Sequence, residues 1–271
     1  MKTLKHDLSD LSFLIPVRID SDERKSNLIA VITFLSDNFI SHIHVLEADS
    51  EQKFDPNEID AEFSYHFITD TDEIYYKTRY VNILLNLAKT KLAAVWDADI
   101  IAYPELVVNG ICRLRKEESF LVIPYDGRVH AVDALLSTIF RQSMEINVLK
   151  DNTALLQLAY GYYSTGGAYI VNRRTYLDNG GENENFYGWG PEDMERVKRM
   201  DVLGLNVHYE KGGGLFHLWH PRRYNSWFAN KETELRNRKE FLHTCKSDRE
   251  SLLQYLKSNQ GNRCKRYSVT H

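Results

Sequence analysis

The sequence lacks the features that mark several large protein classes. Only three cysteines occur in 271 residues (Cys112, Cys245 and Cys264), an odd and widely spaced set that fits neither a disulfide framework nor a zinc knuckle. No apolar run approaches the roughly 18 residues of a membrane helix, and the first residues show no apolar core of a secretory signal. The net charge of −4 lacks the basic excess typical of nucleic-acid binders. We therefore expect a cytoplasmic protein without a nucleic-acid partner.

What is present is typical of one globular domain. Hydrophobic residues make up 43% of the chain and charged residues 27%. No linker rich in Pro, Gly or Ser and no internal repeat divides the sequence. A single domain over residues 1–271 is the prediction.

Strand-like and helix-like segments alternate through the first half of the chain. Asp20 followed by Glu23 resembles a capping box that would start a helix, and Pro104 can open another. This alternation favours an α/β fold with a mainly parallel sheet, in which ligands bind beyond the carboxyl ends of the strands. The apolar or alternating runs that predict strands are residues 11–17, 41–47, 62–68, 92–96 and 119–125.

The second half is less regular. Residues 131–160 are predicted to be mostly helical, and residues 230–257 to form one charged helix before a polar, frayed tail. Gly166 and Gly167 precede the apolar run AYIV. Paired glycines allow a backbone to approach a ligand closely, although a simple turn into a strand explains them equally.

Two carboxylates follow the apolar run 92–96. Asp97 and Asp99 are separated by one residue, so in an extended chain they point to the same side. Neighbouring carboxylates repel unless a cation neutralises them, and their hard oxygens suit Mg²⁺ or Mn²⁺. The alternative is that they cap the turn before the helix at Pro104.

Two histidines three residues apart form a second candidate metal site. His217 and His220 follow a run of glycines, and imidazole is a frequent ligand of first-row metals. A hydrogen-bonded pair beside a packed Trp219 is the alternative.

The segment FYGWGPED (186–193) predicts a helix start with carboxylates in the first turn. Gly190 followed by Pro191 places the proline at the first helical position. Free N–H groups and the helix dipole would present Asp193 rigidly, as a general base requires, although acidic first turns are also common without function. Tyr187 and Trp189, flanked by glycines, can hold the apolar face of a sugar.

Basic residues near predicted strand ends are weaker candidates. Pro16 and Arg18 end the first strand, and Lys77 and Arg79 begin a helix. Their cations can meet phosphates, but solvated surface charge is the more common role of any one of them.

Taken in this order, the motifs resemble the GT-A glycosyltransferases. The resemblance is strongest to the β-1,4-galactosyltransferase family and to related bacterial enzymes that build capsule and surface polysaccharides. It implies a GT-A, Rossmann-like fold with a mixed, mainly parallel sheet flanked by helices. The segments that carry it are IPVR (15–18), WDAD (96–99), TGGAYIVNRRTY (165–176), FYGWGPED (186–193) and HLWH (217–220).

The resemblance implies a role for each matching residue. Asp99 would bind Mn²⁺ (or Mg²⁺) together with His220 and with His217, which stands where the family has Met. Asp97 would lie near the donor's sugar or ribose, and Asp193 would be the general base. Glu192, Trp189 and Tyr187 would lie beside the sugars. The remaining donor-binding positions would be Pro16, Arg18, Gly166, Gly167 and, more loosely, Lys77 and Arg79.

The implied activity is inverting transfer of a galactose or N-acetylhexosamine type of sugar from a UDP-sugar to a glycan or lipid-linked acceptor. The donor half would be residues 1–125 and the acceptor and catalytic half 126–228, followed by a C-terminal helix and tail (229–271). Asp126, Arg128 and His130 are polar candidates for the acceptor side. Peripheral contact with the inner face of a membrane is the most that is expected. A retaining transferase and a catalytically silent sugar-binding module are the alternatives.

Overall fold

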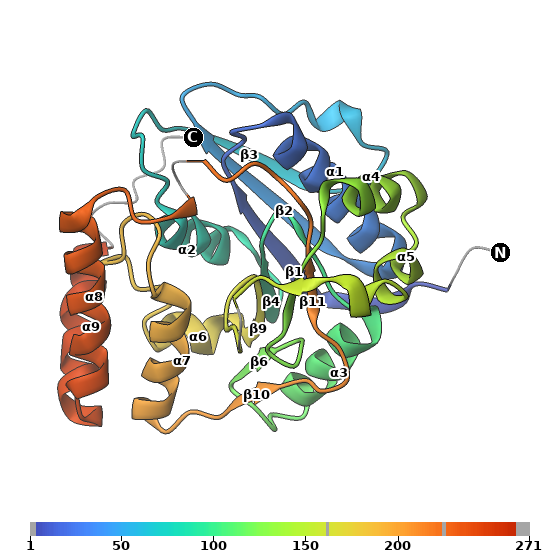
Figure 1. The fold of residues 1–271 in the computed structure, drawn as a ribbon. Coiled ribbons are helices and arrows are strands. Elements are labelled where there is room, and N and C mark those ends of the chain that lie inside the picture. The colour runs from blue at the N-terminus through green and yellow to red at the C-terminus, as the bar shows by residue number, and fades with distance from the viewer. Residues whose placement is uncertain (1–3, 161–162, 224–225, 264–271) are drawn as a thin grey trace.

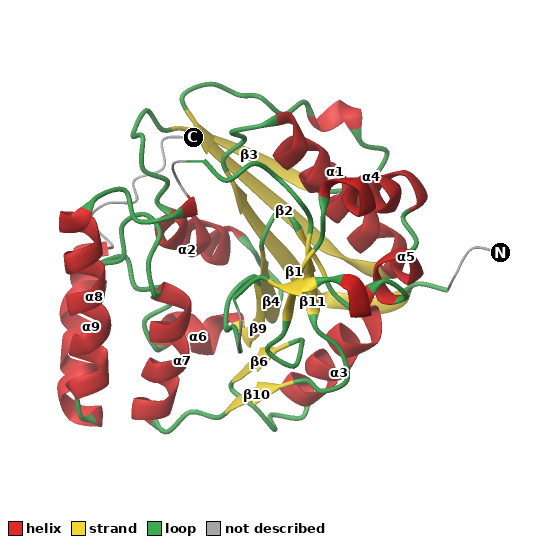
Figure 2. Ribbon diagram, in the orientation of Figure 1, coloured by secondary structure: helices red, strands yellow, loops and turns green. Residues whose placement is uncertain are grey.

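The architecture is a large twisted sheet between two layers of helices, with a small second sheet beside the central strands of the large one (Figures 1 and 2). The structure is a computed structural model that describes residues 4–160, 163–223 and 226–263. Seven strands form the large sheet in the order β10-β6-β9-β4-β1-β2-β3. They are β1 (His6–Val17), β2 (Phe39–Asp49), β3 (Ser64–Thr69), β4 (Leu92–Trp96), β6 (Leu121–Ile123), β9 (Ala168–Asn172) and β10 (Val207–Tyr209).

Helices cover both faces of this sheet, as Figure 2 shows. On one side lie α1 (Asp22–Asn38), α3 (Pro104–Arg115), α4 (Ala134–Ser143) and α5 (Ile146–Lys150). On the other lie α2 (Lys77–Leu87), α6 (Arg173–Asp178) and α7 (Glu192–Leu203), with α8 (Lys231–Lys246) and α9 (Arg249–Arg263) outside α7. Within the described ranges, no helix is both long and apolar enough to span a bilayer.

The centre of the sheet is apolar on both faces, because β1 and β4 are enclosed by helices. Phe13 of β1 and Trp96 of β4 are fully buried and meet edge to face, with ring centroids 5.4 Å apart. β1 pairs in parallel with β2 and β4, and β2 pairs in parallel with β3. The predicted α/β fold with a mainly parallel sheet is confirmed.

One strand of the large sheet runs the other way. β9 lies between β4 and β6 and is antiparallel to both. Gly167, with φ of +85°, turns the chain into β9, and its carbonyl accepts a hydrogen bond from the Asp97 N–H at 2.9 Å. The paired glycines thus lie directly against the carboxyl end of β4.

The small sheet was not anticipated from the sequence. Its order is β5-β11-β7-β8, formed by β5 (Ile100–Ile101), β11 (Leu215–His217), β7 (Val129–Ala131) and β8 (Gln157–Leu158). The prediction that residues 131–160 are mostly helical is therefore only partly right, because β7 and β8 flank α4 and α5. β11 pairs antiparallel with β5, which places His217 opposite Ile100.

Several helix boundaries differ from the expectation by small amounts. Ser21, not Asp20, caps α1 by accepting the Arg24 N–H. Pro191 is the N-cap of α7 and Glu192 its first residue, one position later than predicted. The single C-terminal helix is two, α8 and α9, which Ser247 and Asp248 separate. The predicted frayed tail from residue 264, with Cys264, lies outside the described residues.

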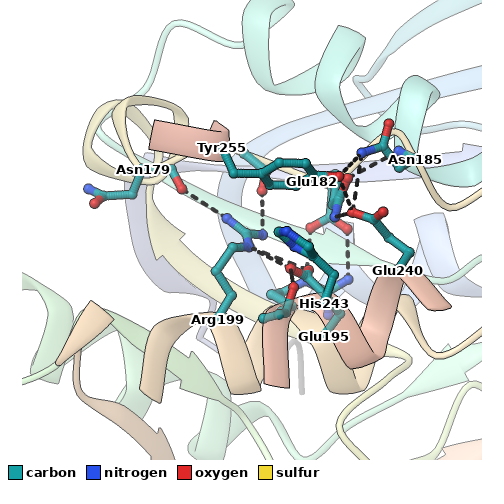
Figure 3. Close-up of polar contacts among 12 residues, drawn as sticks. Asn179, Glu182, Asn185, Glu195, Arg199, Glu240, His243 and Tyr255 are labelled. Carbon is teal, nitrogen blue, oxygen red and sulfur yellow. Dashed lines mark hydrogen bonds and ion pairs between the residues drawn. The ribbon is translucent and has the colours of Figure 1, made fainter. Parts of the chain in front are cut away.

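A buried ionic network fixes α7 against its neighbours. Glu182 accepts two hydrogen bonds from Arg196, one from Nε at 2.8 Å and one from Nη2 at 2.9 Å. It accepts a third from the Tyr169 hydroxyl at 2.6 Å. Arg199 donates to the carbonyls of Asn179 and Gly181 at 2.9 and 2.6 Å, and its Nε lies 3.2 Å from Glu195 (Figure 3). α7 therefore has a single orientation relative to the sheet.

The Glu182–Arg196 pair yields a stability prediction. Glu182→Gln should lower the free energy of unfolding at neutral pH by about 3–5 kcal/mol, because it removes the fully buried carboxylate that pairs with the buried Arg196 guanidinium. Burial alone would raise the pKa of Glu182, but the Arg196 charge and the tyrosine hydroxyls lower it to about 2. The stabilisation is thus complete above pH 4.5, the ordinary value, and is lost as pH falls toward 2.

Urea unfolding at a series of pH values checks this prediction. The difference between wild type and Glu182→Gln should shrink as the solution is acidified. The exposed Glu118→Gln, which loses only a surface contact with Arg113, is the control and should stay within about 0.5 kcal/mol of wild type. If the difference in free energy of unfolding between wild type and Glu182→Gln does not change with pH, Glu182 is not an ionised partner of Arg196.

Candidate active site

A cavity of about 510 Å³ opens at the carboxyl ends of β1 and β4 and gathers most of the predicted site residues. Of the seventeen residues proposed from the sequence, five do not line it, namely Arg79, Tyr187, Asp126, Arg128 and His130. The other twelve are Pro16, Arg18, Lys77, Asp97, Asp99, Gly166, Gly167, Trp189, Glu192, Asp193, His217 and His220.

Asp99, His217 and His220 form a candidate metal centre. One ligand atom from each lies within 4.8 Å of the other two, the only such set of three among the described residues. The Nε2 atoms of His217 and His220 are 3.7 and 3.3 Å from the Asp99 carboxylate. One carboxylate and two imidazoles are a donor set that suits divalent first-row metals. The residues present therefore fit a divalent cation.

The electrostatics of Asp99 favour its ionised form. Its side chain is almost completely buried, and burial alone would raise its pKa. His217, Arg24 and His220 outweigh burial and lower the pKa of Asp99 to about 2. A carboxylate that stays charged at neutral pH is ready to bind a cation.

Arg24 lies in this centre and was missed from the sequence. Its Nη1 donates to Asp99 Oδ2 at 2.9 Å, and its Nε donates to Asp20 Oδ1 at 2.9 Å. The pairing with Asp20, four residues earlier and just before α1, is a local signal that could have drawn attention to it. The contact with Asp99 joins residues too far apart in the sequence to be read from a motif.

Asp97 is paired with a half-buried lysine. Lys77 Nζ lies 2.6 Å from Asp97 Oδ1. Burial alone would lower the pKa of Lys77, but the negative charges of Asp97 and Asp193 raise it above its ordinary value. Lys77 therefore carries a fixed positive charge in the cavity.

Asp193 lies in the first turn of α7, as predicted, and faces the paired glycines. A Cβ on Gly166 would come within 2.2 Å of Asp193 Oδ2, so only glycine leaves room for this carboxylate. The other oxygen, Oδ1, is 3.0 Å from Arg196 Nη2, which the buried Glu182 holds in turn. The carboxylate of Asp193 is thus fixed while part of it stays open to the cavity.

Glu192 precedes Asp193 and is nine-tenths buried. Its Oε2 has no hydrogen-bond partner among the described residues. Burial and the neighbouring Asp193 raise the pKa of Glu192 to about 8. The raised pKa favours the protonated carboxyl, which can donate a hydrogen bond into the cavity.

Aromatic side chains form one wall. Trp189 stacks on Trp227 with ring centroids 4.5 Å apart, and Phe228 meets Trp189 edge to face at 4.8 Å. Trp227, Phe228 and Tyr160 also line the cavity and were not proposed from the sequence. Tyr187 does not line this cavity, because its hydroxyl donates a hydrogen bond to Asp72 and its side chain borders a second cavity.

The basic candidates divide into two groups. Arg18 lines the cavity and is fixed by Asp70 at 2.7 Å and the Ala48 carbonyl at 2.9 Å. Arg79 is exposed on α2, away from the cavity. Among the three candidates for the acceptor side, Asp126 pairs with Arg128 and His130 packs on Phe216; none of them lines the cavity.

One family model matches part of the chain. A family model described as the N-terminal domain of galactosyltransferase matches residues 149–221, a segment that contains Gly166, Asp193, His217 and His220. No curated protein shows a significant sequence match.

Two solved structures share the fold. The first is β-1,4-galactosyltransferase 7 of Drosophila, a mutant in complex with manganese, UDP-Gal and xylobiose, with a TM-score of 0.52 and 16% identity over 85% of this chain and 79% of that chain. The second is glucosyl-3-phosphoglycerate synthase of Mycobacterium tuberculosis with phosphoglyceric acid, with a TM-score of 0.51 and 15% identity over 87% of this chain and 79% of that chain. The fold is the GT-A fold, and the resemblance stated from the sequence is confirmed.

The raised pKa of Glu192 yields a stability prediction. Between pH 4.5 and about 8 the unfolded chain releases this proton while the folded chain keeps it, so wild-type stability falls as pH rises. Glu192→Gln removes this dependence. As pH rises through this range, the free energy of unfolding of the variant should increase relative to that of wild type by about 1.4 kcal/mol for each unit of the pKa shift.

Urea unfolding between about pH 4 and 9 measures the effect. Glu105→Gln, an exposed first-turn substitution in α3, is the matched control and should track wild type. Parallel curves for wild type and Glu192→Gln would show that Glu192 is ionised in the folded protein.

Proposed function

We propose that this chain is a metal-dependent, inverting glycosyltransferase that moves a sugar from a UDP-sugar to a hydroxyl of a glycan or lipid-linked acceptor. One observation carries the proposal. Candidate metal ligands (Asp99, His217, His220) and a candidate general base (Asp193), supplied by separate elements, line the same cavity at the carboxyl edge of a GT-A sheet. The sugar is of the galactose or N-acetylhexosamine type, in keeping with the matching family model.

The donor side is the part of the cavity between β1 and β4. A divalent cation held by Asp99, His217 and His220 would neutralise charge on the departing diphosphate as a Lewis acid. The structure of the Drosophila enzyme holds manganese together with UDP-Gal, which supports Mn²⁺ and a uridine donor here. Arg18 and Lys77 add positive charge where phosphates would lie.

The acceptor side is the part between Asp193 and the aromatic wall. Asp193 accepts the proton of the attacking hydroxyl, while Arg196 holds its other oxygen in place. Trp189 offers an apolar face to a sugar ring, and the protonated Glu192 donates a hydrogen bond to a sugar hydroxyl. A single displacement from the face opposite the leaving diphosphate inverts the anomeric centre. The anomeric configuration of the product, read by NMR, separates this mechanism from a retaining one.

Asp193→Asn should lower the turnover number by about 10²–10⁴-fold, because general base assistance is of that size. The affinity for UDP should stay within about twofold of wild type, since Asp193 does not bind the nucleotide. Transfer kinetics and UDP calorimetry measure the two quantities. Asp201→Asn, an exposed carboxylate on the same helix, is the control. Equal losses of turnover and UDP affinity rule out the assignment of Asp193 as the base.

Asp99→Ala should abolish the part of UDP binding that depends on Mn²⁺, because it removes the only carboxylate of the candidate metal centre. Calorimetry of UDP with and without Mn²⁺ measures it, and we expect a loss of at least about tenfold in the presence of the metal. Asp178→Ala, an exposed carboxylate on α6, should behave as wild type. Unchanged Mn²⁺ dependence in Asp99→Ala contradicts the metal assignment.

A further inference from the structure

The candidate metal centre already contains a cation that belongs to the chain. The Arg24 guanidinium touches two of the three candidate ligands: Nη1 donates to Asp99 Oδ2 at 2.9 Å, and Nη2 lies 3.2 and 3.3 Å from the ring nitrogens of His220. Its Nε is held by Asp20 at 2.9 Å. No other Arg or Lys is recorded in an ion pair with Asp99 in the described part of the chain.

Arg24 and a divalent cation compete for the same centre. A lone pair on Asp99 Oδ2 that accepts an N–H bond is not available to a metal, and Nη2 lies beside the His220 ring nitrogens that would bind one. Burial alone would lower the pKa of Arg24, but Asp99 and Asp20 raise it, so the guanidinium stays charged. A second cation at Asp99 is therefore repelled as long as Arg24 remains there.

The cavity offers Arg24 another partner once a nucleotide is bound. Arg24 lines the same cavity as Pro16 and Arg18, at the side where the diphosphate would lie. A guanidinium binds phosphate oxygens through two parallel N–H bonds, and its rigid plane can shift from Asp99 to a phosphate by rotation of the Arg24 side chain. A diphosphate thus draws Arg24 away from Asp99, and a metal at Asp99 releases Arg24 to the diphosphate.

We propose that Arg24 is a built-in counter-ion of the metal centre and makes the binding of a divalent cation and of a nucleoside diphosphate cooperative. The inference rests on the proposed function, since it takes Asp99 and the two histidines as the metal ligands. As a consequence of the Arg24 charge, the centre binds a divalent cation weakly without nucleotide, and each of the two ligands raises the affinity for the other. The coupling is reciprocal, as linkage requires.

The test is the affinity for Mn²⁺ itself, measured by electron paramagnetic resonance of the free ion without and with saturating UDP. Arg24→Met should bind Mn²⁺ without nucleotide at least about tenfold more tightly than wild type, because the competing charge is gone. The factor by which UDP raises the Mn²⁺ affinity should shrink by a similar amount. Lys25→Met is the matched control: it removes the same charge one residue later on α1, from a pair with Glu58, and should leave both values unchanged.

Each outcome decides the question. An Arg24→Met variant that binds free Mn²⁺ no more tightly than wild type, or that keeps the full effect of UDP, overturns the proposal. Arg24→Lys keeps the positive charge but loses the planar guanidinium, so its affinity for free Mn²⁺ should lie between those of wild type and Arg24→Met. It replaces Arg24→Met if that variant does not fold. Absence of Mn²⁺ binding to wild type even with UDP is a different result, because it refutes the proposed metal centre and with it the proposed function.

Discussion

The register between β5 and β11 is the constraint on which the whole site depends. His217 stands opposite Ile100, and the Leu218 N–H donates to the Asp99 carbonyl at 2.8 Å. The other edge of β11 is held by β7, since the Val132 N–H donates to the His217 carbonyl at 2.9 Å. These few backbone bonds bring two histidines against a carboxylate more than a hundred residues earlier. A slip of one residue would turn His217 to the opposite face of the small sheet and separate it from Asp99.

The charged side chains of the cavity form ion pairs, and a bound substrate can take the place of one partner in a pair. Asp99 is paired with Arg24, Asp97 with Lys77 and Asp193 with Arg196. Arg24, together with the two histidines, keeps the buried Asp99 carboxylate ionised, where an isolated charge would be costly. A diphosphate with its metal brings both signs of charge, so it can satisfy the cations and the carboxylates at once. Glu192 is the exception, since it is neutral, and it supplies a hydrogen-bond donor rather than a charge.

The sequence predicted best what depends on neighbouring residues. Asp97 and Asp99 follow an apolar strand, and Asp193 follows Gly-Pro, so both are visible as local patterns. The direction of β9 was not predictable, because an apolar run of five residues does not encode it, and the strands of the small sheet are only two or three residues long. Tyr187 and Trp189 are two residues apart, yet they border different cavities, which the local pattern of glycines and aromatics did not reveal. Arg24 and the partners of Trp189 depend on contacts between distant segments, which no motif records.

The central claim is that Asp99, His217 and His220 hold a divalent cation at the mouth of the donor site. Anomalous diffraction at the manganese edge, from crystals grown with Mn²⁺ and UDP, tests it most directly. If these three residues hold the ion, one strong peak will lie within about 2.0–2.3 Å of the Asp99 carboxylate and of at least one histidine nitrogen, as for other divalent first-row ions. A peak away from Asp99, or density for UDP with no anomalous signal beside its phosphates, would contradict it.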